Sequence, residues 1–116
     1  MSRFDLIEIP AEFSVQRSTP FFTRANVPPA LLERHNTAEG VFGQICVFTG
    51  RIVFHGYADL DAPEPETTRV VRAGAFIVTA PRYWHRVELS IDARFNIHFW
   101  SNRARTERTM YSTRQS

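Results

Sequence analysis

Four histidines are the residues of this chain best suited to site chemistry: His35, His55, His85 and His98. No two of them form a His-x-His or His-Glu-x-x-His motif, which would hold a metal ion within one short segment. A metal site would therefore have to be assembled from separate strands, in the way that β-barrels place ligands around their mouths. The single cysteine, Cys46, excludes an internal disulfide and a cysteine-rich zinc site.

Composition excludes several other kinds of function. The sequence contains no lysine, which removes Schiff-base chemistry and a phosphate-loop lysine. It also lacks a Gly-x-Ser-x-Gly elbow for a serine hydrolase and a basic stripe for nucleic acid. No window has the apolar length of a membrane span, and the N-terminus has no signal-peptide core. We therefore expect a cytoplasmic protein that binds neither membrane nor nucleic acid.

The elements that must position the histidines are short and alternate apolar with polar residues. Residues 41–59 predict two strands that form a hairpin around Gly50, and residues 69–81 predict two more that are split at Gly74. A short helical turn is expected near residues 28–35, where two prolines precede Ala-Leu-Leu-Glu-Arg. Many short strands with frequent turns and almost no helix predict an all-β barrel or sandwich, and we favour a small barrel.

We expect one domain over residues 1–116, with its core at 16–101 and a basic tail at 102–116. Apolar residues make up 43% of the chain and aromatic residues 13%, as in a globular protein. The basic residues of the tail "SNRARTERTMYSTRQS" are typical of a solvated terminus.

The last strand, "RFNIHFW", places His98 on the same side as Asn96 and Trp100 and opposite Phe95 and Ile97. Taken alone, such a histidine is most often a core or interface residue with one hydrogen bond. To bind a metal it needs partners from elsewhere in the fold. His55 is interpreted as a structural or surface residue.

His85 lies in a segment, "GAFIVTAPRYWHRVEL", that resembles the second cupin motif, in which a glycine, a short strand, a proline and a histidine bring a ligand to the barrel mouth. The spacing is Gly-x6-Pro-x3-His, and the second glycine of that motif is missing. His35 would come from the first cupin motif. That motif normally supplies two histidines and a glutamate, so here it is reduced to one ligand.

Five segments together resemble the TehB/YeaR-like family of small cupin-like proteins: "RSTPFF", "PPALLERHNTAEGVFG", "FHGYAD", "AGAFIVTAPRYWHRVE" and "FNIHFW". The resemblance covers residues 16–101. It implies a double-stranded β-helix (cupin-like) fold and a divalent metal, with no established reaction. We expect no methyltransferase domain of the kind that longer family members carry.

The resemblance assigns the metal ligands to His35, His85 and His98. Relatives carry a carboxylate at the position of His98, and histidine and carboxylate both bind divalent metals of the borderline class. Three imidazoles with an open position resemble zinc sites that activate water and iron sites of some cupin dioxygenases. Zinc is favoured, with iron or nickel as alternatives. We expect five further residues to line a pocket: Arg34, Cys46, Arg82, Tyr83 and Trp100.

The function favoured by the resemblance is metal binding, with capture of a small molecule or oxyanion in a stress response of the tellurite or nitrosative type. Two alternatives stay open. One is a metal-dependent dioxygenase or isomerase that acts on a small polar substrate. The other is a non-catalytic interaction barrel, in which Trp84, Phe99 and Trp100 form a dimer surface. We expect a homodimer.

Overall fold

The computed structural model describes residues 7–102 of the chain. It contains seven strands and one short helix: β1 (Ser14–Ser18), α1 (Pro29–Leu32), β2 (Phe42–Thr49), β3 (Arg51–Tyr57), β4 (Thr67–Arg72), β5 (Phe76–Thr79), β6 (Trp84–Leu89) and β7 (Arg94–Ser101). The all-β prediction is confirmed, and α1 is the helical turn expected near residues 28–35. The predicted tail at 102–116 lies outside the described residues, apart from Asn102.

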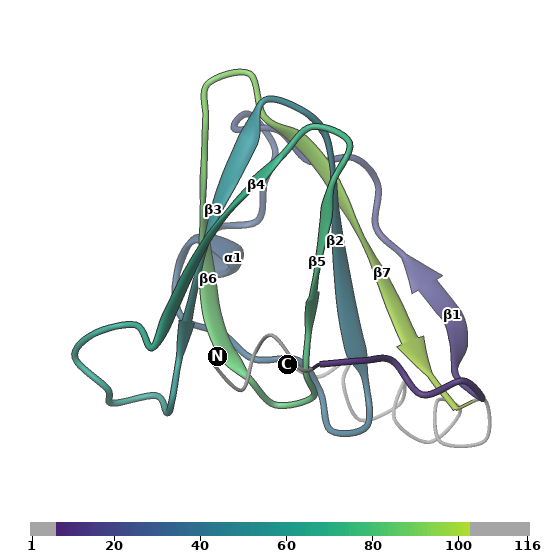
Figure 1. Cartoon of the computed structure of the whole chain (residues 1–116). Helices are drawn as coiled ribbons and strands as arrows, with labels where there is room; N and C mark the ends of the chain where they lie inside the picture. The colour runs from purple at the N-terminus through teal and green to yellow at the C-terminus, as the bar shows by residue number, and fades with distance from the viewer. Residues whose placement is uncertain (1–6, 103–116) are drawn as a thin grey trace.

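The strands form two antiparallel sheets that face each other (Figure 1). One sheet has the order β1-β7-β2-β5, and the other has the order β4-β3-β6. The two sheets lie close together at the upper end of Figure 1 and are farther apart at the lower end. A side chain on either sheet therefore points into the space between the sheets or outward, according to its position in the strand alternation.

No ladder among residues 7–102 joins the two sheets into a closed barrel, so the barrel prediction is corrected to two facing sheets. The hairpin predicted at Gly50 is also wrong. Strand β2 pairs with β5 and β7, whereas β3 pairs with β4 and β6. The turn at Gly50 carries the chain from one sheet to the other. Its φ of 65° favours glycine, and a Cβ there would lie 2.6 Å from Ser90 Oγ.

The core is formed by apolar side chains from the inner faces of both sheets. The largest side chains that are fully buried are Phe54, Phe95, Ile52 and Val47, joined by Thr79. In β2 and β7 the buried residues alternate with more exposed ones, which confirms the period-two interpretation of these strands. Burial of each large apolar side chain stabilises the fold by roughly 1.5–3 kcal/mol.

Buried polar residues are concentrated at one end of the interior: Thr37, Thr67, Thr79, His85 and Ser101. Thr67 and His85 lie near the starts of their strands, and Thr79 and Ser101 end theirs. These strand ends lie at the lower end of Figure 1, where the sheets are farther apart. The interior is therefore apolar at one end and polar at the other.

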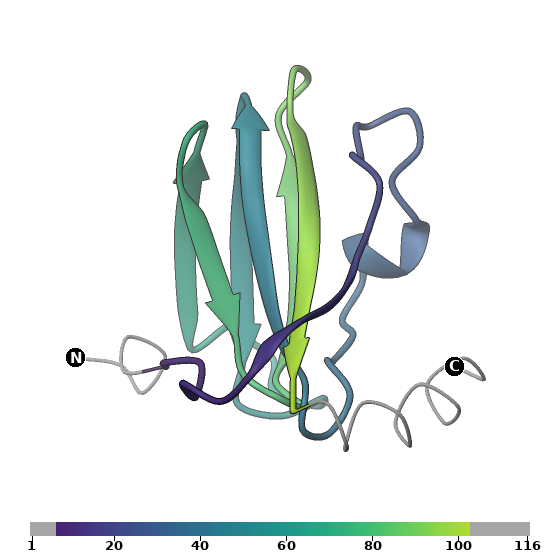
Figure 2. The same ribbon diagram turned by 90° about the vertical axis from the view of Figure 1, so that its right-hand side faces the viewer.

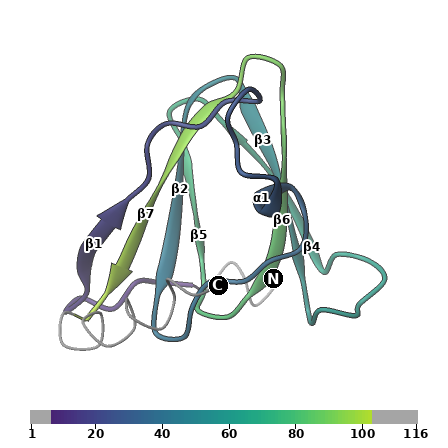
Figure 3. The same cartoon turned by 180° about the vertical axis from the view of Figure 1, so that it is seen from behind.

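The segment between β1 and β2 closes the side of the sandwich next to β6 and β7. Figure 2 shows this segment, with α1, beside the strands, and Figure 3 shows α1 in front of β6 from behind. Phe22 exchanges two backbone hydrogen bonds with Phe95 of β7 and adds its ring to the core. No helix within the described part of the chain is long and apolar enough to cross a membrane.

Candidate functional site

His35 and His85 lie side by side at the polar end of the interior. His85 is the second residue of β6 and is 4% exposed. His35 forms an isolated antiparallel bridge with it, in which each backbone N–H donates to the other residue's carbonyl, at 3.0 and 2.8 Å. Residues paired in this way present their side chains on the same face. The two imidazole centroids are accordingly 4.2 Å apart, with the ring planes at 60°.

Each of these imidazoles has its Nδ1 fixed by a backbone carbonyl. Nδ1 of His85 lies 2.8 Å from the carbonyl oxygen of Tyr83, and Nδ1 of His35 lies 2.9 Å from that of Glu33. A carbonyl oxygen only accepts hydrogen bonds, so both Nδ1 atoms carry the proton. In the neutral rings the lone pair is then on Nε2, which is the atom that can bind a metal ion.

Burial keeps both imidazoles neutral. It lowers the pKa of His85 to about 3, with a smaller contribution from the nearby His35, while the bond to the Tyr83 carbonyl opposes the shift. The pKa of His35 is also lowered by burial, against the opposing effect of its bond to Glu33. The ring of Phe54 stacks on His85 with centroids 5.2 Å apart and adds an apolar wall.

The turn before β6 places the carbonyl that orients His85. Tyr83 N–H donates to the Ala80 carbonyl at 3.3 Å, and Arg82 has a φ of 63°, which is uncommon for a residue with a side chain. Tyr83 then turns inward and lies on Gly56, where an added Cβ would be 2.5 Å from the ring. Its hydroxyl donates to Glu66 at 2.7 Å, so the ring is held at both ends.

The chain after His35 links the two sheets at this end. Thr37 Oγ1 lies 3.1 Å from Thr79 Oγ1 of β5, and the Thr37 carbonyl accepts a hydrogen bond from the Arg82 backbone at 2.7 Å. Gly43 leaves room for the pair, because a Cβ there would be 2.8 Å from Thr79 Oγ1. Neither threonine was predicted from the sequence as part of the site. Their signal was the period-two alternation in "FIVT", which places Thr79 on the buried side together with Ile77.

His98 is not brought to the other two predicted ligands. It lies on β7 between Ile97, which is buried, and Phe99, which is partly buried against the core, so it points to the outer face of the four-stranded sheet. There its Nδ1 lies 2.6 Å from Ser18 Oγ. Between residues 7 and 102, no three His, Cys, Asp or Glu side chains are grouped so that they could hold a metal ion. The structure thus assembles a pair of histidines and not the predicted set of three.

The five residues predicted to line one pocket are distributed over three regions. Tyr83 is next to the histidine pair, and Arg82 is exposed at the same end and pairs with Glu39 at 3.5 Å. Arg34 stacks on the Tyr57 ring at 3.7 Å, on the outer face of the three-stranded sheet. Trp100 lies on the outer face of the other sheet, where its Nε1 donates to Gln44 at 3.0 Å.

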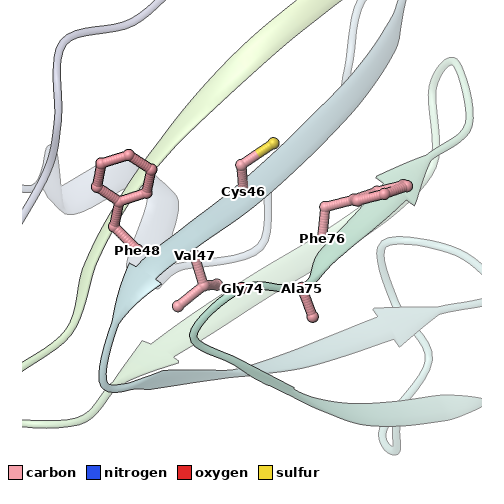
Figure 4. Close-up of a pocket in the computed structure, with 6 residues that line it drawn as sticks. All are labelled: Cys46, Val47, Phe48, Gly74, Ala75 and Phe76. Carbon is pink, nitrogen blue, oxygen red and sulfur yellow. The ribbon is translucent and has the colours of Figure 1, made fainter.

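Cys46 also lies on that outer face, in an open groove of about 440 Å³ (Figure 4). The groove is lined by Cys46, Val47, Phe48, Gly74, Ala75 and Phe76. Burial raises the pKa of the thiol, which disfavours the thiolate form that acts as a nucleophile or ligand. The groove and the histidine pair are therefore separate features, on opposite faces of the sheet.

The arrangement at the polar end is suited to ligation by nitrogen. Two neutral imidazoles present Nε2 lone pairs, and their other nitrogens are held by the backbone. Donation of the second ring N–H to a carbonyl is the usual support of a metal-binding histidine. The donor set fits zinc, iron, nickel or copper, which imidazole suits, better than magnesium or calcium, which take oxygen ligands.

Comparisons with known proteins agree on one family. The TehB-like domain matches residues 17–97. The chain is 35% identical over 99 residues to the uncharacterized protein YeaR of Escherichia coli K12, and the match covers 82% of this chain and 83% of YeaR. It is 29% identical over 90 residues to the probable S-adenosyl-L-methionine-dependent methyltransferase TehB of Haemophilus influenzae, covering 77% of this chain and 31% of TehB.

Two crystal structures share the fold. One is of a protein from E. coli K12, with a TM-score of 0.78, 34% identity and coverage of 82% of this chain and 96% of that chain. The other is of TehB from H. influenzae, with a TM-score of 0.72, 26% identity and coverage of 79% of this chain and 32% of that chain. Since the domain match includes both histidines of the pair and five of the seven described strands in full, the chain belongs to the TehB-like family.

Proposed function

We propose that this TehB-like domain binds one divalent transition-metal ion through Nε2 of His35 and His85. The remaining coordination positions would be open to water, a small molecule or an oxyanion. Zinc is the proposed metal, with iron or nickel as alternatives, because all three accept imidazole nitrogen. The proposal keeps two of the three ligands predicted from the sequence. It leaves His98 out, because that residue lies on the outer face of the other sheet.

The observation that carries the proposal is the matched orientation of the two rings. Both Nδ1 atoms are held by backbone carbonyls, and the ring centroids are only 4.2 Å apart. A neutral imidazole has one N–H donor and one lone pair, and in each of these rings the N–H is already bonded to a carbonyl. The two remaining Nε2 lone pairs, on adjacent rings at the polar end of the interior, are then available to a shared cation.

The charge of the pair supports an anionic or polar ligand. Two neutral imidazoles leave the full positive charge on a divalent ion, so the site would attract an anion more strongly than one with carboxylate ligands. A metal bound in this way supplies Lewis acidity to whatever occupies its open positions. The physiological part, an oxyanion or small molecule in a tellurite or nitrosative stress response, rests on the family resemblance alone.

The proposal is tested by titrating chelator-treated protein with zinc sulfate in a calorimeter. We expect one ion per chain, and a loss of affinity of at least about 100-fold for His85→Gln and for His35→Gln, since one of two protein ligands is removed. His98→Gln and His55→Gln are matched controls and are expected to keep the wild-type affinity. Unchanged binding in the His35/His85 double variant, or loss of binding in His98→Gln, would contradict the proposal.

The expected homodimer is a separate proposal. Of the aromatic residues first assigned to a dimer surface, Phe99 is covered by Arg17 at 4.5 Å and Trp100 is bonded to Gln44. The exposed apolar side chains include two phenylalanines, Phe48 and Phe76, at 60% and 58% exposure, and Ile91 at 85%. Light scattering after size exclusion is expected to give twice the chain mass. A monomer at all concentrations would contradict the proposal.

A further inference from the structure

A second group of chemically active side chains lies on the outer face of the three-stranded sheet, on the side opposite the histidine pair. Thr68 of β4 and His55 of β3 are directly opposite each other in their ladder. His55 Nδ1 lies 3.2 Å from Thr68 Oγ1, and His55 Nε2 lies 2.6 Å from Glu88 Oε2 of β6. The three residues form a hydrogen-bonded series of hydroxyl, imidazole and carboxylate across three adjacent strands.

The ionisation state of the Glu88 carboxylate determines the direction of the hydrogen bonds in this series. The hydrogen bond from His55 and the nearby Arg86 guanidinium, 3.3 Å away, lower the pKa of Glu88, so its carboxylate is ionised and can only accept. His55 therefore carries its proton on Nε2 when the ring is neutral. Its Nδ1 then has the lone pair, which accepts the hydroxyl proton of Thr68.

We propose that Thr68 is a nucleophilic hydroxyl, activated by His55 and Glu88, that accepts an acyl group from an activated ester. A hydroxyl bonded to an imidazole, with the imidazole in turn oriented by a third group, is the general arrangement of an activated nucleophile. His55 would act as the general base, and Glu88 would position the ring and stabilise its positive charge.

The step balances without an oxidant or a further reactant. Thr68 Oγ attacks the carbonyl carbon and its proton moves to His55 Nδ1. The bond between the acyl carbon and the alcohol or phenol oxygen of the donor breaks, and that oxygen leaves with the electron pair. His55 then returns the proton to the leaving group or to water. The products are an ester on Thr68 and the free alcohol or phenol.

The surroundings indicate which acyl groups the hydroxyl would accept. Val53 and Val70 are the next pair along the same face of the ladder, and Val70 is 50% exposed. An acyl chain on Thr68 would lie against these two side chains, so a small uncharged acyl group is favoured over a charged one. No other threonine hydroxyl within residues 7–102 is bonded to an imidazole: Thr49 Oγ1, for example, donates to the Asp92 carbonyl at 2.7 Å.

The test uses 4-nitrophenyl acetate as the acyl donor and follows acetylation by peptide mass spectrometry. A chelator is present, so that a metal at the histidine pair cannot hydrolyse the ester. Because the chain contains no lysine, the N-terminus is its only primary amine that can be acetylated. We expect acetylation at Thr68 in the wild type and in Thr68→Ser, and none at this position in Thr68→Val.

The variants of the other two residues decide whether the hydroxyl is activated. We expect His55→Gln to slow acetylation of residue 68 by about 100-fold, the lower range of what a positioned general base contributes. Thr49→Val is the control and is expected to leave the rate at Thr68 unchanged. If His55→Gln loses its fold by circular dichroism, Glu88→Gln decides instead: slower acetylation supports the proposal. Equal acetylation of Thr49 and Thr68, or an unchanged rate in a folded His55 or Glu88 variant, overturns it.

Discussion

The contact between Gly56 and Tyr83 predicts a large effect of a very small substitution. In Gly56→Ala the new methyl group would lie 2.5 Å from the Tyr83 ring and 2.9 Å from Thr67 Cγ2. Tyr83 cannot move aside freely, because its ring is buried and its hydroxyl is bonded to Glu66. Thr67 is buried as well. Overpacking costs about 1–3 kcal/mol, and a strained or lost bond to the carboxylate adds to it. We expect a total loss of about 3 kcal/mol.

The assay is urea unfolding of metal-free protein, followed by circular dichroism. A double-mutant cycle identifies the cause of the loss. Tyr83→Leu removes the ring that the methyl group meets, so Gly56→Ala is expected to cost about 1–2 kcal/mol less in the Tyr83→Leu background than in the wild type. The methyl group of Gly56→Ala would also displace the Tyr83 carbonyl that orients His85. We therefore expect zinc affinity to fall together with stability.

Gly74→Ala is the matched control. A Cβ at Gly74 meets no atom within 4 Å, but its φ of 90° strains any other residue. It should destabilise through the backbone alone, with no coupling to Tyr83. A clash with Tyr83 is ruled out if Gly56→Ala changes stability by less than about 0.5 kcal/mol, the size of an ordinary surface substitution, or if its effect adds fully to that of Tyr83→Leu.

Two further predictions concern titratable groups. Because the folded-state pKa of His85 is lowered to about 3, its stabilising contribution is fully present above the unfolded pKa and is lost as pH falls below it. Metal-free protein should lose about 2 kcal/mol between pH 6.5 and pH 5, as measured by urea unfolding, and an equally steep loss in His85→Gln would contradict this. Burial raises the pKa of Cys46, so iodoacetamide should alkylate it more slowly at neutral pH than free cysteine; equal or faster labelling would argue against the burial.

The sequence predicted the strands well because their side-chain alternation is a local property. The alternation in "RFNIHFW" places His98 on the side of the strand opposite the buried Phe95 and Ile97, as the structure shows. That same observation argues against His98 as an interior ligand. The family resemblance suggested the opposite, because it concerns the identity of the residue at a position and not the face from which its side chain projects.

The pairing of the strands could not be predicted in the same way. Gly50 correctly marked a turn, but a turn does not determine whether its two strands pair with each other. In this fold β2 pairs with β5 and β7, and β3 pairs with β4 and β6. These pairings allow residues from both sheets to be buried in one common core. Such partners depend on contacts between distant segments, which local patterns do not encode.

The histidine pair was predicted in part. His35 and His85 were identified from motif resemblance, and the structure brings them together. The features that orient them gave no sequence signal. The left-handed residue in the turn before His85 is Arg82 and not the glycine usual at such a position. The carbonyls of Glu33 and Tyr83 act through backbone atoms that every residue has, so no residue type indicated their role.

Crystals of the protein grown with zinc and measured at the zinc absorption edge would show directly whether His35 and His85 share one metal ion. We expect an anomalous difference peak about 2.0–2.1 Å from Nε2 of both residues. A shared metal ion is contradicted if that position is empty, or if the zinc lies instead at His98 or at His55.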